Sequence, residues 1–234
     1  MSNLRHNSVK NAIALGLAIW GIGQIARPIV QPVRAQPSLP ELQGRSQAET
    51  VLQLYGGPRT RAPLVQWYLE ELAVPYQYIA LNIRAQEQRQ PEFLAINPMG
   101  KVPAIADGDF KLWESGAILL YLADKYGQMP ESVEARAVMT QWVIFANATL
   151  GPGLFLEDRR DRETPRLLKP LDRILTQQPF IVGSELTVAD IAVGSYLHYA
   201  RVLLSLDLSH YPAINRYLNQ LSERPAFAKT LGQR

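Results

Sequence analysis

Two stretches near the middle of the 234-residue chain contain residues that can bind a small ligand. In the first, KVPAIA, Pro103 interrupts a run that otherwise reads as a β-strand, although proline cannot donate to a sheet ladder. A cis Val102–Pro103 bond would turn the N–H and C=O groups of Val102 outward. Those groups can pair with an extended peptide as an added edge strand does, so this stretch predicts a main-chain peptide-binding site.

The second stretch contains Glu114 and Ser115, which begin the helix predicted over residues 114–127. Unpaired N–H groups and the helix dipole at such an end favour a ligand carboxylate. The carboxylate of Glu114 can hold an ammonium group beside it. Together with Val102, these residues predict a receptor for a small zwitterionic peptide.

The elements that must position these residues form a predicted α/β sandwich over residues 50–127. Apolar runs and helical spacing alternate along it, and Asp107-Gly108-Asp109 is a strong hairpin signal. A strand, a helix and a second strand in this order give a parallel pair through a right-handed crossover. The expected order is strand 51–56, helix 62–74, strand 75–81, an irregular or helical connection 85–96, strands 101–106 and 110–114, and helix 114–127.

Residues 128–234 form a second, all-helical domain in this prediction. The clearest helix start is the capping box from Thr187 to Asp190, which precedes a long apolar run. Proline and glycine predict breaks within the helical region. The expected breaks are at Gly151-Pro152-Gly153, Pro165, Gln178-Pro179, Tyr211-Pro212 and Arg224-Pro225.

Composition excludes several classes of function. The formal charge of +3 comes from four basic residues and no acidic ones within residues 1–35, which leaves 20 basic and 21 acidic residues elsewhere. A neutral body of this kind does not predict a nucleic-acid partner. The chain contains no cysteine, and its three histidines are far apart, so neither a protein thiol nor a metal site is predicted.

Residues 1–49 are expected to be a targeting or anchoring segment and a linker. A basic start precedes the uncharged run 11–26, and a region rich in Pro, Gln and Ser follows. The run is shorter than the ~20 residues of a spanning helix, and Val33-Arg34-Ala35 resembles a signal-peptide cleavage site. The alternatives are a membrane anchor with a cytoplasmic domain, export by a signal peptide, and a start codon assigned too far upstream of a soluble cytoplasmic protein.

The segment NPMGKVPAIADGDFKLWESGAIL resembles the glutathione-binding segment of cytosolic-type glutathione S-transferases. The resemblance extends from about Val51 to Arg234, and the stretches LYGGPRTRAP and EFLAINPMGKVPAI are most similar to the cyanobacterial chi class. It implies a thioredoxin-like N-terminal domain, an all-helical C-terminal domain and a homodimer. Glutathione is then a co-substrate, and no cofactor is expected.

The resemblance also implies roles for individual residues. Lys101, Val102 and Pro103 match the positions around the cis-proline, and Val102 would read the cysteinyl amide. Glu114 and Ser115 match the residues that hold the γ-glutamyl group. Gln88 and Arg89 lie where many relatives have a His-Lys pair near the glycine carboxylate; Arg89 keeps the charge, whereas Gln88 departs from the pattern.

Such an enzyme must activate a thiol. An unperturbed thiol of pKa ~8.5 is only ~3% thiolate at pH 7. Lowering this pKa by two units requires that the site stabilise the thiolate over the thiol by ~2.7 kcal/mol. Two hydroxyl groups compete for this role in LYGGPRTRAP. Tyr55 with Arg59 and Arg61 resembles the tyrosine-type pattern, whereas Thr60 falls where serine-type relatives have their donor, and we favour Thr60.

The expected activity is addition of the glutathione thiolate to hydrophobic electrophiles, with a possible peroxidase activity. Trp142, Phe145 and Phe155 are candidates for lining the electrophile site, although aromatics at helical spacing more often belong to a core. Thiol-transferase chemistry is not expected because it normally uses a protein cysteine. The alternative function is a non-catalytic, membrane-associated module that binds glutathione or another ligand, with residues 11–26 as the membrane contact.

Overall fold

The computed structural model describes residues 51–57 and 59–232, which lie within one compact unit. A four-stranded mixed sheet contains β1 (Leu52–Gly56), β2 (Tyr76–Ala80), β3 (Ala104–Asp107) and β4 (Phe110–Trp113) in the order β2-β1-β3-β4. Strand β1 pairs with β2 in parallel and with β3 antiparallel, and β3 pairs antiparallel with β4. The predicted parallel pair and hairpin are therefore confirmed.

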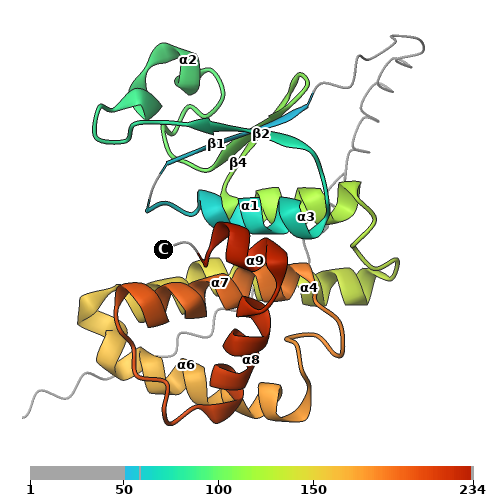
Figure 1. Ribbon diagram of the computed structural model, residues 1–234, viewed down its shortest axis with the longest axis vertical. Coiled ribbons are helices and arrows are strands. Elements are labelled where there is room, and N and C mark those ends of the chain that lie inside the picture. The colour runs from blue at the N-terminus through green and yellow to red at the C-terminus, as the bar shows by residue number, and fades with distance from the viewer. Residues whose placement is uncertain (1–50, 58, 233–234) are drawn as a thin grey trace, which may run out of the picture. The chain divides into compact units, whose positions relative to one another are not determined.

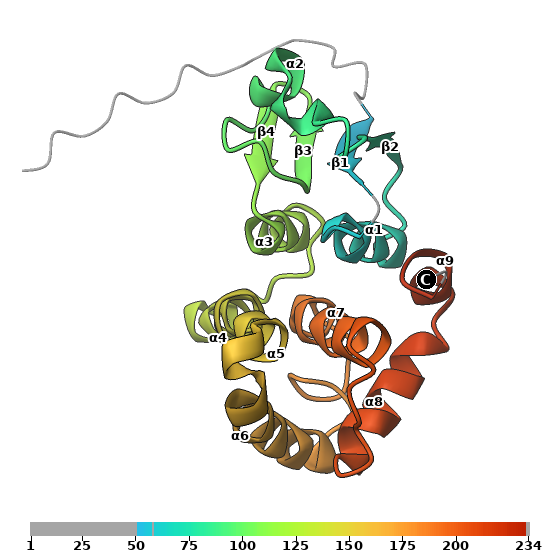
Figure 2. The same ribbon diagram turned by 90° about the vertical axis from the view of Figure 1, so that its left-hand side faces the viewer.

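Helices cover both faces of this sheet (Figures 1 and 2). On the face toward the helical domain lie α1 (Ala62–Glu71) and α3 (Ser115–Lys125), whereas α2 (Pro91–Leu94) and the 3-10 turn η1 (Glu87–Arg89) lie on the other. Along β1, buried Leu52 and Leu54 alternate with the more accessible Gln53 and Tyr55, as the period of two requires. This arrangement is the expected thioredoxin-like domain.

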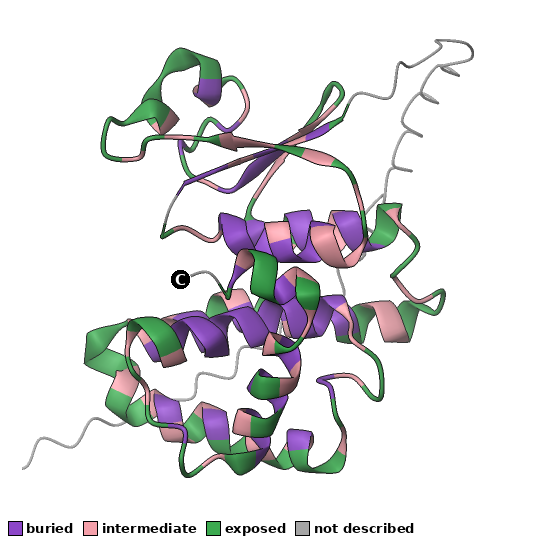
Figure 3. Ribbon diagram, viewed as in Figure 1, coloured by how far each residue is buried: buried purple, intermediate pink, exposed green. Residues whose placement is uncertain are grey.

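The remaining elements are all helical and pack around α7 (Val188–Leu203). Residues 188–200 of α7 are buried without interruption, so this helix is the centre of the second core (Figure 3). Trp67 of α1 packs edge-on against Phe227 at 5.0 Å between ring centroids, which joins the two domains. The other elements are α4 (Val133–Phe145), the π-helical segment η2 (Ala146–Leu150), α5 (Gly151–Phe155), α6 (Glu157–Gln177), α8 (Pro212–Ser222) and α9 (Pro225–Thr230).

The predicted break at Gly151-Pro152-Gly153 is wrong, because helical structure continues from α4 through η2 into α5 and ends at Phe155. The π-helical segment lies directly before Gly151 and carries the helix past the glycine-proline sequence; such segments are frequent at functional sites. Pro152 has no N–H to donate to the preceding turn, and it follows directly after the π-helical segment, where the regular α-helical hydrogen-bond pattern is already interrupted. A Cβ at Gly151 would approach Tyr196 Cε1 to 2.7 Å, so the glycine allows α7 to pack closely.

The predicted break at Pro165 is also wrong, because α6 contains both Pro165 and Pro170. Three apolar side chains of this helix, Leu168, Leu171 and Leu175, are buried. Their burial outweighs the loss of helical hydrogen bonds that each proline imposes. The predicted breaks before α7, α8 and α9 are confirmed by the observed helix boundaries.

The capping box at the start of α7 is confirmed. Asp190 Oδ2 accepts hydrogen bonds from the N–H and Oγ1 of Thr187, both at 2.9 Å. Its Oδ1 accepts from the Ile181 N–H at 2.7 Å and from the Tyr217 hydroxyl at 3.1 Å. Burial raises the pKa of the Asp190 carboxyl against the effect of these donors. The carboxylate therefore ties the loop before α7 and helix α8 to the core.

The expected targeting segment, residues 1–49, lies outside the described residues. Among the helices that the structure does describe, none is both long and apolar enough to span a membrane.

Candidate functional site

A cavity of about 360 Å³ lies where the two domains meet. Its size is within the range of small-molecule sites, which are mostly apolar with a few polar groups. The N-terminal domain contributes the loop before α1 and Val102, and the helical domain contributes α5 and α7. The lining residues are Arg59, Thr60, Arg61, Val102, Phe155, Tyr196, Tyr199 and Leu203.

Thr60 places a hydroxyl group in this cavity, at the N-terminus of α1. Its Oγ1 accepts a hydrogen bond from the Ala62 N–H at 3.2 Å and donates to the Gly57 carbonyl at 2.7 Å. The first bond fixes the oxygen beside the helix terminus. Rotation of the hydroxyl hydrogen away from Gly57 would let it donate to a ligand while the bond from Ala62 is kept.

Tyr55, the competing hydroxyl, lies in a different cavity on the face of the sheet that carries α2. It is among the residues that line this second cavity, and its ring is 5.7 Å from that of Phe93. Its hydroxyl donates to Gln53 Oε1 at 2.8 Å, and burial raises the pKa of the phenol. The structure therefore does not bring Tyr55 together with Thr60. Tyr55 alternates along β1 with buried Leu54 and so faces the side of the sheet that carries α2, whereas Thr60 lies in the loop before α1.

The Val102–Pro103 bond is cis, as predicted. Pro103 does not interrupt the strand, because the pairing of β1 with β3 ends at Ala104 and leaves Val102 outside it. Buried Asn97 holds this loop, since its Nδ2 donates to the Lys101 carbonyl at 2.6 Å and its Oδ1 accepts from the Met99 N–H at 3.0 Å. The loop therefore presents the Val102 main chain at the cavity, with the Lys101 side chain exposed beside it.

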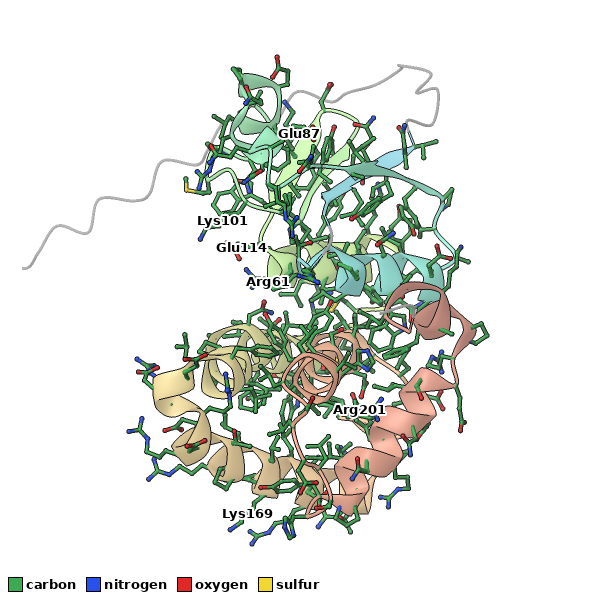
Figure 4. All side chains as sticks on the ribbon, turned by 60° about the vertical axis from the view of Figure 1, so that its left-hand side comes forward. Arg61, Glu87, Lys101, Glu114, Lys169 and Arg201 are labelled. Atoms are coloured by element: carbon green, nitrogen blue, oxygen red, sulfur yellow. The ribbon has the colours of Figure 1, made fainter. Side chains whose placement is uncertain are left out.

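Glu114 and Ser115 lie at the N-terminus of α3, as predicted. Glu114 is exposed and has φ 71° and ψ 118°, a conformation that residues other than glycine rarely adopt and that is concentrated at ligand clamps. Ser115 is fully buried. Figure 4 shows Lys101, Glu114 and Arg61 one below another where the sheet domain meets the helical domain.

Asn147 joins these residues across the domain boundary. Its Oδ1 accepts hydrogen bonds from Arg61 Nη1 at 3.2 Å, Ser115 Oγ at 3.0 Å and the Tyr196 hydroxyl at 3.1 Å. Arg61 Nη1 also donates to the Tyr196 oxygen at 3.2 Å. The π-helical segment presents Asn147 here, where its Nδ2 donates to the Val143 carbonyl at 2.9 Å. One amide therefore connects the α3 terminus to the wall of the cavity.

Gln88 and Arg89 lie in η1 beside the Met99-Gly100 turn. Arg89 is exposed, and its Nη1 donates to the Met99 carbonyl at 3.2 Å. Gly100 has φ 59°, and a Cβ there would approach Arg89 Nη1 and the Gln88 carbonyl to 2.9 Å. Gln88 Oε1 is buried without a hydrogen-bond partner among the described residues. An amide oxygen that lacks a partner suits a ligand donor.

Of the three aromatic candidates, Phe155 lines the cavity, whereas Trp142 and Phe145 are not among its lining residues. Those two rings pack edge-on at 5.4 Å between centroids and are partly buried against the core. The cavity is also lined from α7 by Tyr196, Tyr199 and Leu203, which were not predicted from the sequence. Their spacing of three and four residues after the capping box places them on one helix face, and this signal was available in the sequence.

The fold and the cavity together define a two-domain protein whose thioredoxin-like and helical halves share one ligand site. The family described as "Glutathione S-transferase, N-terminal domain" matches residues 50–124, and "Glutathione S-transferase, C-terminal domain" matches residues 155–234. The chain therefore belongs to the glutathione S-transferase family.

Individual relatives agree with this assignment. Disulfide-bond oxidoreductase YfcG of Escherichia coli is 32% identical over 204 residues, which are 77% of this chain and 94% of that protein. Glutathione S-transferase GstB of the same organism is 34% identical over 185 residues, which are 70% of this chain and 88% of that protein.

The solved structures include a glutathione transferase of Burkholderia graminis with two glutathione molecules bound per subunit. It has a TM-score of 0.71 and 32% identity, and the match covers 80% of this chain and 89% of that chain. A family member from Pseudomonas fluorescens, also with two glutathione molecules bound, has a TM-score of 0.71 and 33% identity over 80% of this chain and 94% of that chain.

Proposed function

We propose that the protein is a glutathione transferase that adds the glutathione thiolate to hydrophobic electrophiles. The observation that supports this most strongly is the series of hydrogen bonds through Asn147 at the domain boundary. In it, the α3 terminus that would hold the γ-glutamyl group connects through Asn147 to the cavity that contains Thr60. Glutathione that is held by its γ-glutamyl group at the α3 terminus would therefore have its thiol near the cavity that contains Thr60.

Glutathione would bind along the edge of the sheet domain. The N–H groups at the start of α3 bind its γ-glutamyl carboxylate, and Glu114 holds the ammonium group. The Val102 main chain pairs with the cysteinyl amide, as in the addition of an edge strand. Gln88, Arg89 and Lys101 lie toward the glycine carboxylate, where the cation of Arg89 supplies charge.

Thr60 would activate the thiol by donating a hydrogen bond to the thiolate. Arg59 and Arg61 add positive charge to the same cavity, and the N-terminus of α1 adds its dipole. Each of these interactions stabilises the charged form of sulfur and so lowers the pKa of the thiol.

The assay is conjugation of 1-chloro-2,4-dinitrobenzene by the full-length protein with saturating glutathione. We expect acceleration over the uncatalysed reaction, and a loss of roughly twofold to thirtyfold in kcat for Thr60→Val, because a hydrogen bond to the thiolate contributes ~1.5–3 kcal/mol and its formation gives up the bond to the Gly57 carbonyl, worth ~1 kcal/mol. Retention on immobilised glutathione without conjugation of any of several electrophiles would instead support the non-catalytic binding module.

A second candidate function is reduction of disulfides by two glutathione molecules. The relative named as a disulfide-bond oxidoreductase and the two structures with two glutathione molecules bound favour it. The absence of cysteine does not prevent this reaction, because the second glutathione can supply the second thiolate. One thiolate opens the substrate disulfide, the other attacks the mixed disulfide, and the products are glutathione disulfide and two thiols. The same stoichiometry reduces a peroxide to an alcohol and water.

Glutathione-dependent reduction of hydroxyethyl disulfide, coupled to glutathione reductase, distinguishes the two chemistries. A rate well above that with the aryl halide would favour disulfide reduction.

A homodimer and a membrane-associated leader complete the proposal. Exposed apolar side chains on α4, with Val133 76% and Ile144 57% exposed, support a partner surface. Light scattering of the wild type and of Ile144→Glu tests the dimer.

Cell fractionation, with a mass measurement of the protein, tests whether residues 11–26 anchor a cytoplasmic domain; a soluble periplasmic product cleaved near Ala35 would exclude the anchor.

A further inference from the structure

The cavity at the domain boundary has two chemically different walls. Phe155, Leu203, Tyr196 and Tyr199 form a mostly apolar wall on the side of the helical domain, whereas Arg59 and Arg61 line the cavity from the loop before α1 and bring two positive charges to it. An electrophile site for purely hydrophobic molecules needs the first wall alone. The second wall adds two positive charges, of which the single negative charge of the thiolate would balance only one.

No carboxylate among the described residues forms an ion pair with Arg59 or Arg61. The lining of the cavity contains no Asp or Glu, and the ion pairs of the described part of the chain involve other cations. The hydrogen-bond partners of Arg61 are the neutral Asn147 and Tyr196. Uncompensated guanidinium groups in a partly apolar cavity favour an anionic ligand, because arginine matches a carboxylate with two parallel hydrogen bonds.

The two arginines are placed differently. Arg61 is half-buried and shares Asn147 with Ser115, so it lies at the end of the cavity where glutathione would bind. Arg59 is exposed and makes no hydrogen bond or ion pair within the described residues. Its φ of 59° is rare for a residue with a side chain, and such backbone conformations cluster at ligand clamps. Arg59 is therefore the cation available to the second substrate.

We propose that this cavity selects electrophiles that carry a carboxylate or a similar anionic group, with Arg59 binding the anion and the α7 face binding the ring. The inference rests on the proposed glutathione chemistry and names its substrate class. With a chloronitrobenzoate, the thiolate sulfur forms a bond to the ring carbon that bears chlorine. The carbon–chlorine bond breaks, and chloride leaves with the electron pair, so no oxidant or reductant is required.

The test compares 4-chloro-3-nitrobenzoate with its neutral amide, 4-chloro-3-nitrobenzamide, which has the same ring and leaving group. We expect the full-length protein to have a higher kcat/KM for the carboxylate, after correction for the uncatalysed rates. In Arg59→Gln the ratio of the two kcat/KM values falls about tenfold, because the substrate carboxylate loses its hydrogen bonds from a charged, partly exposed guanidinium group. Arg173→Gln, an exposed arginine of α6, makes the same change in net charge and leaves the ratio unaltered.

A binding measurement separates this inference from the proposed function. Titration calorimetry with 3-nitrobenzoate and 3-nitrobenzamide, in the presence of S-methylglutathione, needs no turnover. Arg59-dependent binding of the acid without conjugation of either electrophile would support the anion site and contradict the transferase proposal. Conjugation of the amide at an equal rate, with no preference for the acid in either measurement, would overturn the anion site alone. A rise in the KM for glutathione in Arg59→Gln, at an unchanged ratio, would assign Arg59 to glutathione and overturn it as well.

Discussion

Replacement of Thr60 by valine should raise the pKa of the thiol of bound glutathione. Valine keeps the shape of threonine but removes the hydroxyl that lies in the cavity at the N-terminus of α1. The bond that Thr60 Oγ1 accepts from Ala62 is lost together with the bond that it would donate to sulfur. Since the thiolate is the charged form, loss of its donor favours the thiol.

The expected shift follows from the hydrogen bonds of Thr60. A bond to the thiolate contributes ~1.5–3 kcal/mol, and its formation gives up the bond to the Gly57 carbonyl, worth ~1 kcal/mol. The net stabilisation of ~0.5–2 kcal/mol corresponds to a rise of ~0.4–1.5 pKa units in the variant. From a bound thiol of pKa ~6.5, the thiolate fraction at pH 7 would fall from about three quarters to between roughly a tenth and a half.

The ultraviolet absorbance of the thiolate, recorded against pH for glutathione bound to the wild type and to Thr60→Val, measures this shift. Tyr55→Phe provides the comparison, because Tyr55 lies in the other cavity. A thiol pKa that rises in Tyr55→Phe and stays constant in Thr60→Val would refute the assignment and show that the sheet domain rearranges when glutathione binds.

Three other predictions concern the contacts that hold the site and the fold. Asn147→Ala removes the acceptor shared by three donors, so we expect a loss of ~1–3 kcal/mol of unfolding free energy and a higher KM for glutathione; an unchanged KM would contradict the role of Asn147 at the site. Arg224→Lys loses the two parallel bonds to Glu71, each 2.7 Å, that join α9 to α1; denaturant unfolding should show a loss of ~1–2 kcal/mol, and an unchanged midpoint would contradict it. Although burial alone would raise the pKa of Asp107, the hydrogen bonds from Lys125 and from a tyrosine lower it. Because this carboxylate then stabilises the fold above its unfolded pKa and the effect disappears as pH falls through the lower folded pKa, the difference in Tm between the wild type and Asp107→Asn should be present at pH 6 and should shrink progressively as the pH falls below about 4.

The sequence predicts those parts of the fold that depend on local signals. The hairpin follows from Asp107-Gly108 and the start of α7 from its capping box, and the structure confirms both. The uninterrupted helix through η2 and α5 could not be predicted in this way, because it depends on the close approach of α7 at Gly151. A glycine-proline pair signals a turn unless distant packing overrides it.

The candidate site also contains features that depend on neighbouring residues, which were predictable, and contacts between distant residues, which were not. The main-chain features, cis Pro103 and the α3 terminus at Ser115, were predictable because proline and helix caps act through neighbouring residues. Asn147 was not, since a lone polar residue within a helix carries no local sign of its three partners. The placement of Tyr55 and Thr60 in different cavities also needed the structure, because the alternation along β1 does not reveal which face of the sheet meets the helical domain.

Glutathione binding at the α3 terminus is the central claim, and titration calorimetry of Glu114→Gln tests it most directly. The wild type should bind glutathione, and Glu114→Gln should bind it at least tenfold more weakly, because the ligand ammonium loses a charged partner worth ~1.5–3 kcal/mol. Glu185→Gln, an exposed residue between α6 and α7, should bind it as the wild type does. Equal affinity in all three proteins, or no binding to the wild type, would contradict the account.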